Sequence, residues 1–130
     1  MDEVLRFLTE CGIYYLATTE DGKPRVRPFG TAEIFENKLY IQTGKKKDVY
    51  KQILKNPFVE LCAYKDGKWL RVSGKLIPDD RYEAKKDMLD KNPQLRMMYD
   101  ENDDNTIVLY FENAEATFSE FGKESWSVRF

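Results

Sequence analysis

Hydrophobic and polar residues alternate with a period of two along much of the chain, which is the pattern of half-buried β-strands. Asp-Gly pairs at 21–22 and 66–67 favour tight hairpins, because such pairs adopt the positive φ angles of these turns. Strands joined by hairpins with few helices indicate a closed or partly closed antiparallel barrel, in one domain spanning residues 1–130. The predicted strands are 13–19, 24–35, 38–43, 58–64, 68–77, 106–112 and 114–121, and 122–130 is a tail. The predicted helices are 2–11, 48–55, one opened by 78–80, and a short piece after 92–93.

Two predicted strands depart from regular alternation. Pro28 and Gly30 interrupt the segment 24–35 and predict a bulge or a sheet edge there. The segment Thr106–Phe111 is apolar on both faces, so it needs a second covering layer. In so small a protein the simplest cover is a partner subunit, and we therefore expect a homodimer.

The composition excludes several classes of chemistry. The chain has a formal net charge of −2 and no basic tail, so nucleic acid is not expected as its main partner. It contains no histidine, which excludes Ser/His and Cys/His catalysis, histidine-ligated haem and nearly all zinc chemistry. No catalytic side chain and no metal site is therefore predicted. Cys11 and Cys62 fit no metal or redox spacing, and we interpret them as reduced core thiols of a cytoplasmic protein. No segment resembles a signal peptide or a membrane span, so no membrane partner is expected.

Three consecutive lysines, Lys45, Lys46 and Lys47, stand where the helix 48–55 is predicted to begin. Lysine is unfavourable there because a helix N-terminus already carries partial positive charge. A bound phosphate would remove this conflict, since free N–H groups, ammonium groups and the Thr43 hydroxyl would converge on it. Gly44 would let the backbone approach closely. The alternative is a solvated run of charges.

Arg25 and Arg27 share one face of a predicted strand, because residues two apart point the same way. Two adjacent arginines repel unless solvent or an anion separates them. Pro28 and Gly30 then break regular pairing and leave backbone groups available to a ligand. The alternative is an exposed edge strand protected by its charges.

Two aromatic residues complete the set of candidates. Leu70 and Val72 alternate toward a core, which places Trp69 on the opposite face of its strand, where it suits a ligand ring or subunit packing. Phe118 lies in the last predicted strand and suits the same surface or the core.

These segments resemble the FMN-binding split barrels of the pyridoxamine-phosphate-oxidase-like family, more narrowly its short bacterial general-stress and nitroimidazole-reductase-like flavoproteins. The resemblance runs from the first helix to about Phe121 and is most specific in 22–30, 39–47, Asn56-Pro57 and 69–74. It implies a mainly β fold with short helices, an antiparallel Greek-key split β-barrel. It also implies a homodimer with a flavin at the subunit interface.

The resemblance also implies roles for individual residues. Arg27, Lys46 and Lys47 would hold the FMN phosphate, and the backbone of 28–30 would meet the polar edge of the isoalloxazine ring. Aromatic residues would close the site from the other subunit. The candidate cofactor-binding residues are therefore Arg25, Arg27, Pro28, Phe29, Gly30, Thr43, Gly44, Lys46, Lys47, Trp69 and Phe118.

The implied function is that of an oxidoreductase passing electrons from NAD(P)H through FMN to a small oxidised substrate. The chain ends Ser125–Phe130 without the Arg/His signature by which the oxidase branch holds its vitamin substrate, so pyridoxamine-phosphate oxidation is not expected. Two alternatives stay open. One is a flavin- or deazaflavin-binding protein without turnover, serving storage or sensing, and the other is a structural dimerisation domain.

Overall fold

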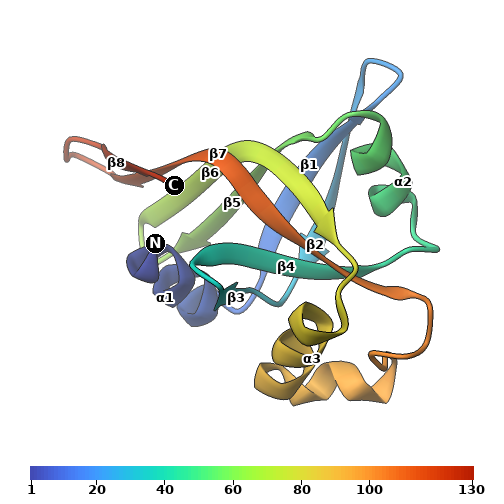
Figure 1. Cartoon of the computed structure of the whole chain (residues 1–130). Coiled ribbons are helices and arrows are strands. Elements are labelled where there is room, and N and C mark those ends of the chain that lie inside the picture. Colours follow the sequence, from blue (N-terminus) through green and yellow to red (C-terminus); the bar gives the residue numbers. More distant parts are fainter.

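A computed structural model describes all residues, 1–130, and its eight strands form one antiparallel sheet in the order β2-β1-β5-β6-β7-β4-β3, with β8 paired to β7 (Figure 1). The strands are β1 (Tyr14–Glu20), β2 (Lys23–Phe29), β3 (Glu33–Phe35), β4 (Lys38–Gly44), β5 (Phe58–Lys65), β6 (Lys68–Asp79), β7 (Thr106–Glu120) and β8 (Trp126–Arg129). The helices are α1 (Asp2–Cys11), α2 (Asp48–Lys55), α3 (Tyr82–Lys91) and the 3₁₀ helix η1 (Pro93–Met97). The predicted mainly β, antiparallel fold is confirmed, as are helices 2–11 and 48–55.

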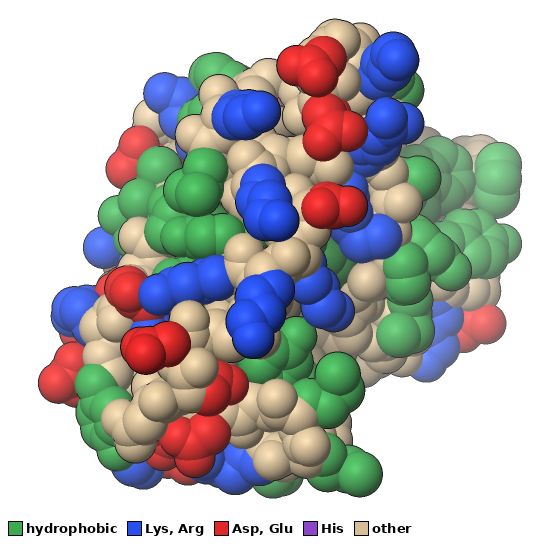
Figure 2. Space-filling view, turned by 90° about the vertical axis from the view of Figure 1, so that its right-hand side faces the viewer, with side chains coloured by type: hydrophobic (Ala, Val, Ile, Leu, Met, Phe, Trp, Pro, Cys, Tyr) green, Lys and Arg blue, Asp and Glu red, His purple; other side chains and the backbone are tan.

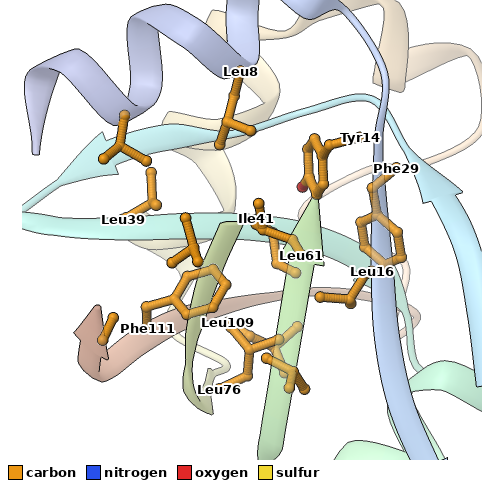
Figure 3. Packing of buried hydrophobic residues seen from close by; sticks show 14 of the residues in the cluster. Leu8, Tyr14, Leu16, Phe29, Leu39, Ile41, Leu61, Leu76, Leu109 and Phe111 are labelled. Carbon is orange, nitrogen blue, oxygen red and sulfur yellow. The ribbon is translucent and has the colours of Figure 1, made fainter. Parts of the chain in front are cut away.

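The core lies inside the curled sheet, where side chains from α1, β1, β4, β5, β6 and β7 point toward one another (Figure 3). Alternate residues of each strand supply it, so that Val59, Leu61 and Ala63 of β5 are buried while their neighbours on the other face are not. The two cysteines are unpaired and half-buried, at the margin of this core rather than inside it.

The segment predicted as one strand over 24–35 is two strands separated by Gly30–Ala32. β2 pairs with β1 only as far as Phe29, and β3 pairs with β4 instead. The buried Tyr14 hydroxyl donates a hydrogen bond to the Thr31 carbonyl at 2.6 Å, and burial raises the pKa of this phenol. This contact holds the connecting segment beside the end of β2, where a cavity opens.

The segment predicted as two strands over 106–121 is the single strand β7. Asn113 adopts a positive φ of 52°, opposite a register shift between Ser73 and Lys75 of β6, so β7 bends without ending. Gly74 leaves little space for a side chain at this bend, because a Cβ there would lie 3.0 Å from the Ala114 Cα. The predicted tail is also wrong in part, since Trp126–Arg129 pairs with β7 as β8.

The second layer over β7 comes from the chain itself, so the prediction that a partner subunit covers 106–111 is wrong. Val108 of β7 packs with Tyr40 of β4 and with Ala84 and Met88 of α3. The predicted helix begins at Tyr82 rather than near Pro78, because β6 continues to Asp79. A pattern that is apolar on both faces shows that a cover exists but does not say which segment provides it.

A buried carboxylate anchors the start of α3 to β4. The Tyr40 hydroxyl donates a hydrogen bond to Asp79 Oδ2 at 2.8 Å, and Arg81 Nη2 donates to the same oxygen at 2.9 Å. Burial raises the pKa of Asp79, but the hydrogen bonds from Arg81 and Tyr40 outweigh this effect and leave the pKa below its usual value. The anchored helix and η1 lie side by side below one end of the sheet (Figure 1).

Candidate binding site

A cavity of about 300 Å³ opens where the end of β2, the end of β4, the start of α2 and η1 meet. Its wall combines backbone of an interrupted strand, two basic side chains and several neutral polar groups. The lining residues are Arg27, Pro28, Phe29, Gly30, Thr31, Gln42, Thr43, Lys47, Val49, Gln94 and Leu95. Six of the sequence candidates therefore line one cavity, although Pro28 and Phe29 lie on β2 and Thr43 lies on β4, strands that are not neighbours in the sheet.

Arg27 is held at the cavity by neutral hydrogen-bond acceptors only. Its Nη1 donates to the Leu16 carbonyl at 3.1 Å and to Thr18 Oγ1 at 2.8 Å, and its Nη2 donates to Gln52 Oε1 at 2.6 Å. No carboxylate forms an ion pair with Arg27. Every other arginine of the chain is more exposed, and four of them are paired with a carboxylate, so Arg27 is the arginine for which a missing counter-ion costs most. Half-burial of an uncompensated cation is costly, so this position is suited to an incoming anion.

The electrostatic environment of Arg27 also favours the binding of an anion. Burial, and next the neighbouring charge of Arg25, lower the pKa of its guanidinium. The group stays protonated because arginine titrates far above neutral pH. The nearby charges of Asp48 and Glu20 act in the opposite direction but do not outweigh these two effects, so the free cation is disfavoured and a bound anion would stabilise it.

The three lysines of the cationic segment behave differently from one another. Lys45 forms an ion pair with Asp80 at 2.9 Å, but Asp80 also pairs with Lys85, so the charge of Lys45 is only partly balanced. The side chains of Lys46 and Lys47 are exposed and form no ion pair, and Lys47 lines the cavity as the N-cap residue of α2. Figure 2 shows lysine and arginine side chains gathered over the face of the molecule that carries α2.

Asn105 shapes the backbone of this segment. Its carbonyl oxygen accepts a hydrogen bond from the Lys45 N–H at 2.7 Å, and its Oδ1 accepts one from the Lys46 N–H at 3.1 Å. Gly44 packs closely here, since a Cβ would lie 3.1 Å from Asn105 Nδ2 and 3.2 Å from the Tyr99 ring. The close approach at this glycine is therefore to side chains of the same chain, whereas the sequence suggested a close approach to a ligand.

Five sequence candidates do not line this cavity, namely Arg25, Gly44, Lys46, Trp69 and Phe118. Arg25 is exposed and its Nε is 3.3 Å from Glu20 Oε1. Trp69 and Phe118 line a second cavity of about 300 Å³ near β8. Phe118 stacks on Trp126 there, with ring centroids 4.4 Å apart. Within one chain these aromatic residues do not meet Arg27.

Sequence reasoning missed two polar residues that hold Arg27, namely Thr18 and Gln52. Both are buried, with 2% and 4% of their surface exposed. A signal for Gln52 was present, because it shares the apolar face of α2 with Val49 and Ile53. It also missed Thr31, Gln42, Val49, Gln94 and Leu95 in the cavity wall.

The residues around the cavity do not offer a metal site. No three of the cysteine, aspartate and glutamate side chains of the chain are placed to hold a metal ion together.

Among the helices, none has the length and apolar character needed to cross a membrane.

Comparisons with known proteins place this fold and cavity in context. Residues 1–88 match the family model described as pyridoxamine 5'-phosphate oxidase. A NimC/NimA family protein from Clostridium acetobutylicum is 43% identical, with a TM-score of 0.93 over 98% of this chain and 93% of that chain. The General Stress Protein 26 from Bacillus anthracis is 17% identical, with a TM-score of 0.74 over 97% of each chain.

A more distant structure has the same fold. It is a pyridoxamine 5'-phosphate oxidase-related, FMN binding protein from Nostoc punctiforme, 17% identical, with a TM-score of 0.66 over 99% of this chain and 93% of that chain. No curated protein matches the chain significantly. The family model covers more than half of the chain, and the Clostridium protein is similar over nearly all of it, so this chain belongs to the pyridoxamine 5'-phosphate oxidase family.

Proposed function

We propose that this protein binds FMN in the cavity beside Arg27 and works as an FMN-dependent oxidoreductase. The observation that carries the proposal is the half-buried Arg27 guanidinium, which has neutral partners and no counter-ion. The phosphate of FMN would supply the missing negative charge. Family membership and the FMN-binding neighbour from Nostoc support the choice of a flavin over other anions.

The residues of the cavity fit the phosphate of FMN. Arg27 and Lys47 offer charged donors, Thr43 offers a hydroxyl, and Lys46 stands beside them at the start of α2. The N-terminus of α2 adds its partial positive charge. These groups would hold a dianion through several charge-assisted hydrogen bonds.

The end of β2 fits the polar edge of the flavin ring. Pro28 lacks an N–H group, β2 ends at Phe29, and Gly30 lies beyond the ladder with β1. Their remaining backbone groups would form hydrogen bonds with the ring. The hydrogen bond from Tyr14 to Thr31 keeps this segment in place.

A second copy of the chain would complete the site. The cavity of about 300 Å³ lies at the lower end of the range for ligand pockets, so one chain alone would leave much of FMN uncovered. The outer face of β1, β2 and β5 carries exposed apolar side chains, including Tyr15 (54% exposed), Val26 (67%) and Tyr64 (62%). We propose that this face pairs with a second copy, whose Trp69 and Phe118 close the flavin site.

When bound, FMN would supply the redox chemistry, accepting a hydride equivalent from NAD(P)H and delivering electrons to a small oxidised substrate. The cavity wall contains no cysteine, aspartate or glutamate that could act as an acid or base. The chain's own contribution is to bind, to orient and, through Arg27 and Lys47, to favour negative charge. A cavity that only binds and orients a flavin would serve a second candidate equally well, a flavin- or deazaflavin-binding protein without turnover.

Titration of the purified protein with FMN tests the proposal. We expect one FMN per chain to bind, with quenched flavin fluorescence and a yellow dimer on gel filtration. NADH or NADPH should then bleach the flavin absorbance, and a suitable acceptor should restore it. Binding without bleaching would favour the storage or sensing role. A protein that stays colourless with excess FMN would refute the proposal.

A further inference from the structure

Gln52 of α2 lies at the centre of a closed hydrogen-bond network behind the cavity. Its Oε1 accepts hydrogen bonds from Thr18 Oγ1 at 2.5 Å and from Arg27 Nη2 at 2.6 Å. Thr18 Oγ1 in turn accepts from Arg27 Nη1 at 2.8 Å. The three side chains come from α2, β1 and β2, so the network fixes the guanidinium to three elements at once.

The network orients Arg27 without neutralising it. Gln52 and Thr18 are both buried and both uncharged. A glutamate at position 52 would reach the same atoms, since it differs from glutamine only in its terminal group. That carboxylate would form a short ion pair with Arg27 and satisfy its charge within the chain.

Neither of the nearby carboxylates, Glu20 and Asp48, forms such an ion pair with Arg27. Glu20 is paired with Arg25 at 3.3 Å, and Asp48 lies exposed in the first turn of α2 without an ion pair to Arg27. The position that most directly determines the charge balance of Arg27 is therefore occupied by a neutral amide. Glutamine provides the acceptor that aligns the cation and leaves it without a directly bonded carboxylate, because Asp48 and Glu20 act on it only as nearby charges.

We propose that Gln52 is a positioning residue that holds Arg27 in place and reserves its positive charge for the anionic group of the ligand. The inference rests on the proposed FMN function for the identity of that anion. In this role Gln52 also contributes to specificity, because a neutral network around Arg27 favours phosphorylated ligands over their uncharged counterparts. A purely structural role for Gln52 would make no such distinction.

The matched variants Gln52→Glu and Gln52→Met separate charge from packing. Gln52→Glu should lower the affinity for FMN by about tenfold or more, equivalent to one charge-assisted contact, and leave the affinity for riboflavin unchanged. The melting temperature of its ligand-free form should equal or exceed that of wild type, because Arg27 gains a partner. Gln52→Met removes the acceptor without adding charge, and should lose stability while losing less FMN affinity than Gln52→Glu.

A structural role would instead make affinity follow stability in both variants. Gln52→Glu with wild-type FMN affinity, or an equal loss for riboflavin, would overturn the inference. Inorganic phosphate, compared with chloride at equal ionic strength, provides a probe independent of flavin. If phosphate raises the melting temperature of wild type but not of Gln52→Glu while FMN does not bind, the proposed function fails and the role of Gln52 stands. If phosphate stabilises neither protein and FMN does not bind, both fail.

Discussion

Replacing Arg27 with glutamine is expected to weaken FMN binding by roughly 10- to 150-fold. This range corresponds to the loss of a charge-assisted contact worth about 1.5–3 kcal/mol. The guanidinium is the only cation of the cavity that is held in place by buried side chains, so nothing nearby can take over its role. Fluorescence titration with FMN at fixed ionic strength measures the effect, since added salt would weaken the contact by itself.

Arg25→Gln is the matched control for that experiment. Arg25 lies two residues earlier on β2 and on the same face, but it is exposed and paired with Glu20. Its replacement should leave FMN affinity close to the wild-type value, because exposed ion pairs contribute little. Equal losses in both variants would show that general surface charge, rather than the geometry around Arg27, holds the ligand.

Replacing Met88 with alanine is expected to lower the free energy of unfolding by about 2–5 kcal/mol. Met88 is 1% exposed and packs against Tyr40 and Val108, so its truncation leaves a cavity between α3 and the sheet. The effect follows from the finding that α3, and not a partner subunit, covers this side of β7. Chemical denaturation of the ligand-free protein measures it.

Met97→Ala provides the comparison at the other extreme of burial. Met97 ends η1 and is 88% exposed, so its truncation removes little packing and should change stability by no more than about 0.5 kcal/mol. A loss at Met88 as small as that at Met97 would mean that α3 does not form part of the folded core.

The regular part of the fold was predictable because it depends on local patterns. The Asp-Gly hairpins, the alternation in β5 and β6, and the helix 48–55 ended by Asn56-Pro57 all follow from neighbouring residues. The wrong predictions fall where tertiary contacts determine whether a strand continues or forms. β7 continues through Asn113 because it pairs with β6 on both sides of the bend, and β8 forms because β7 offers it an edge.

The candidate site was predictable in its charges and less so in its geometry. Arg27 and Lys47 were conspicuous as unusual cations, and the structure brings both to one cavity. The ion pair that ties up Lys45 involves Asp80, far away in the sequence, so no local pattern could reveal it. The same holds for Gln52, whose importance appears only when α2 is placed against β1 and β2.

The placement of Trp69 and Phe118 depends on a second chain and stays a proposal. Within one chain the two residues line a cavity of their own. A sequence pattern can show that an aromatic residue lies on the outer face of a strand, but it does not show what covers that face.

The most direct test of the central claim compares FMN with riboflavin, which has the same ring and lacks the phosphate. Calorimetric titration of the wild-type protein should give an affinity for FMN about 100-fold or more above that for riboflavin, because two or more charge-assisted contacts go to the phosphate. Equal affinities for the two flavins would contradict the account, since Arg27 and Lys47 would then have no part in binding.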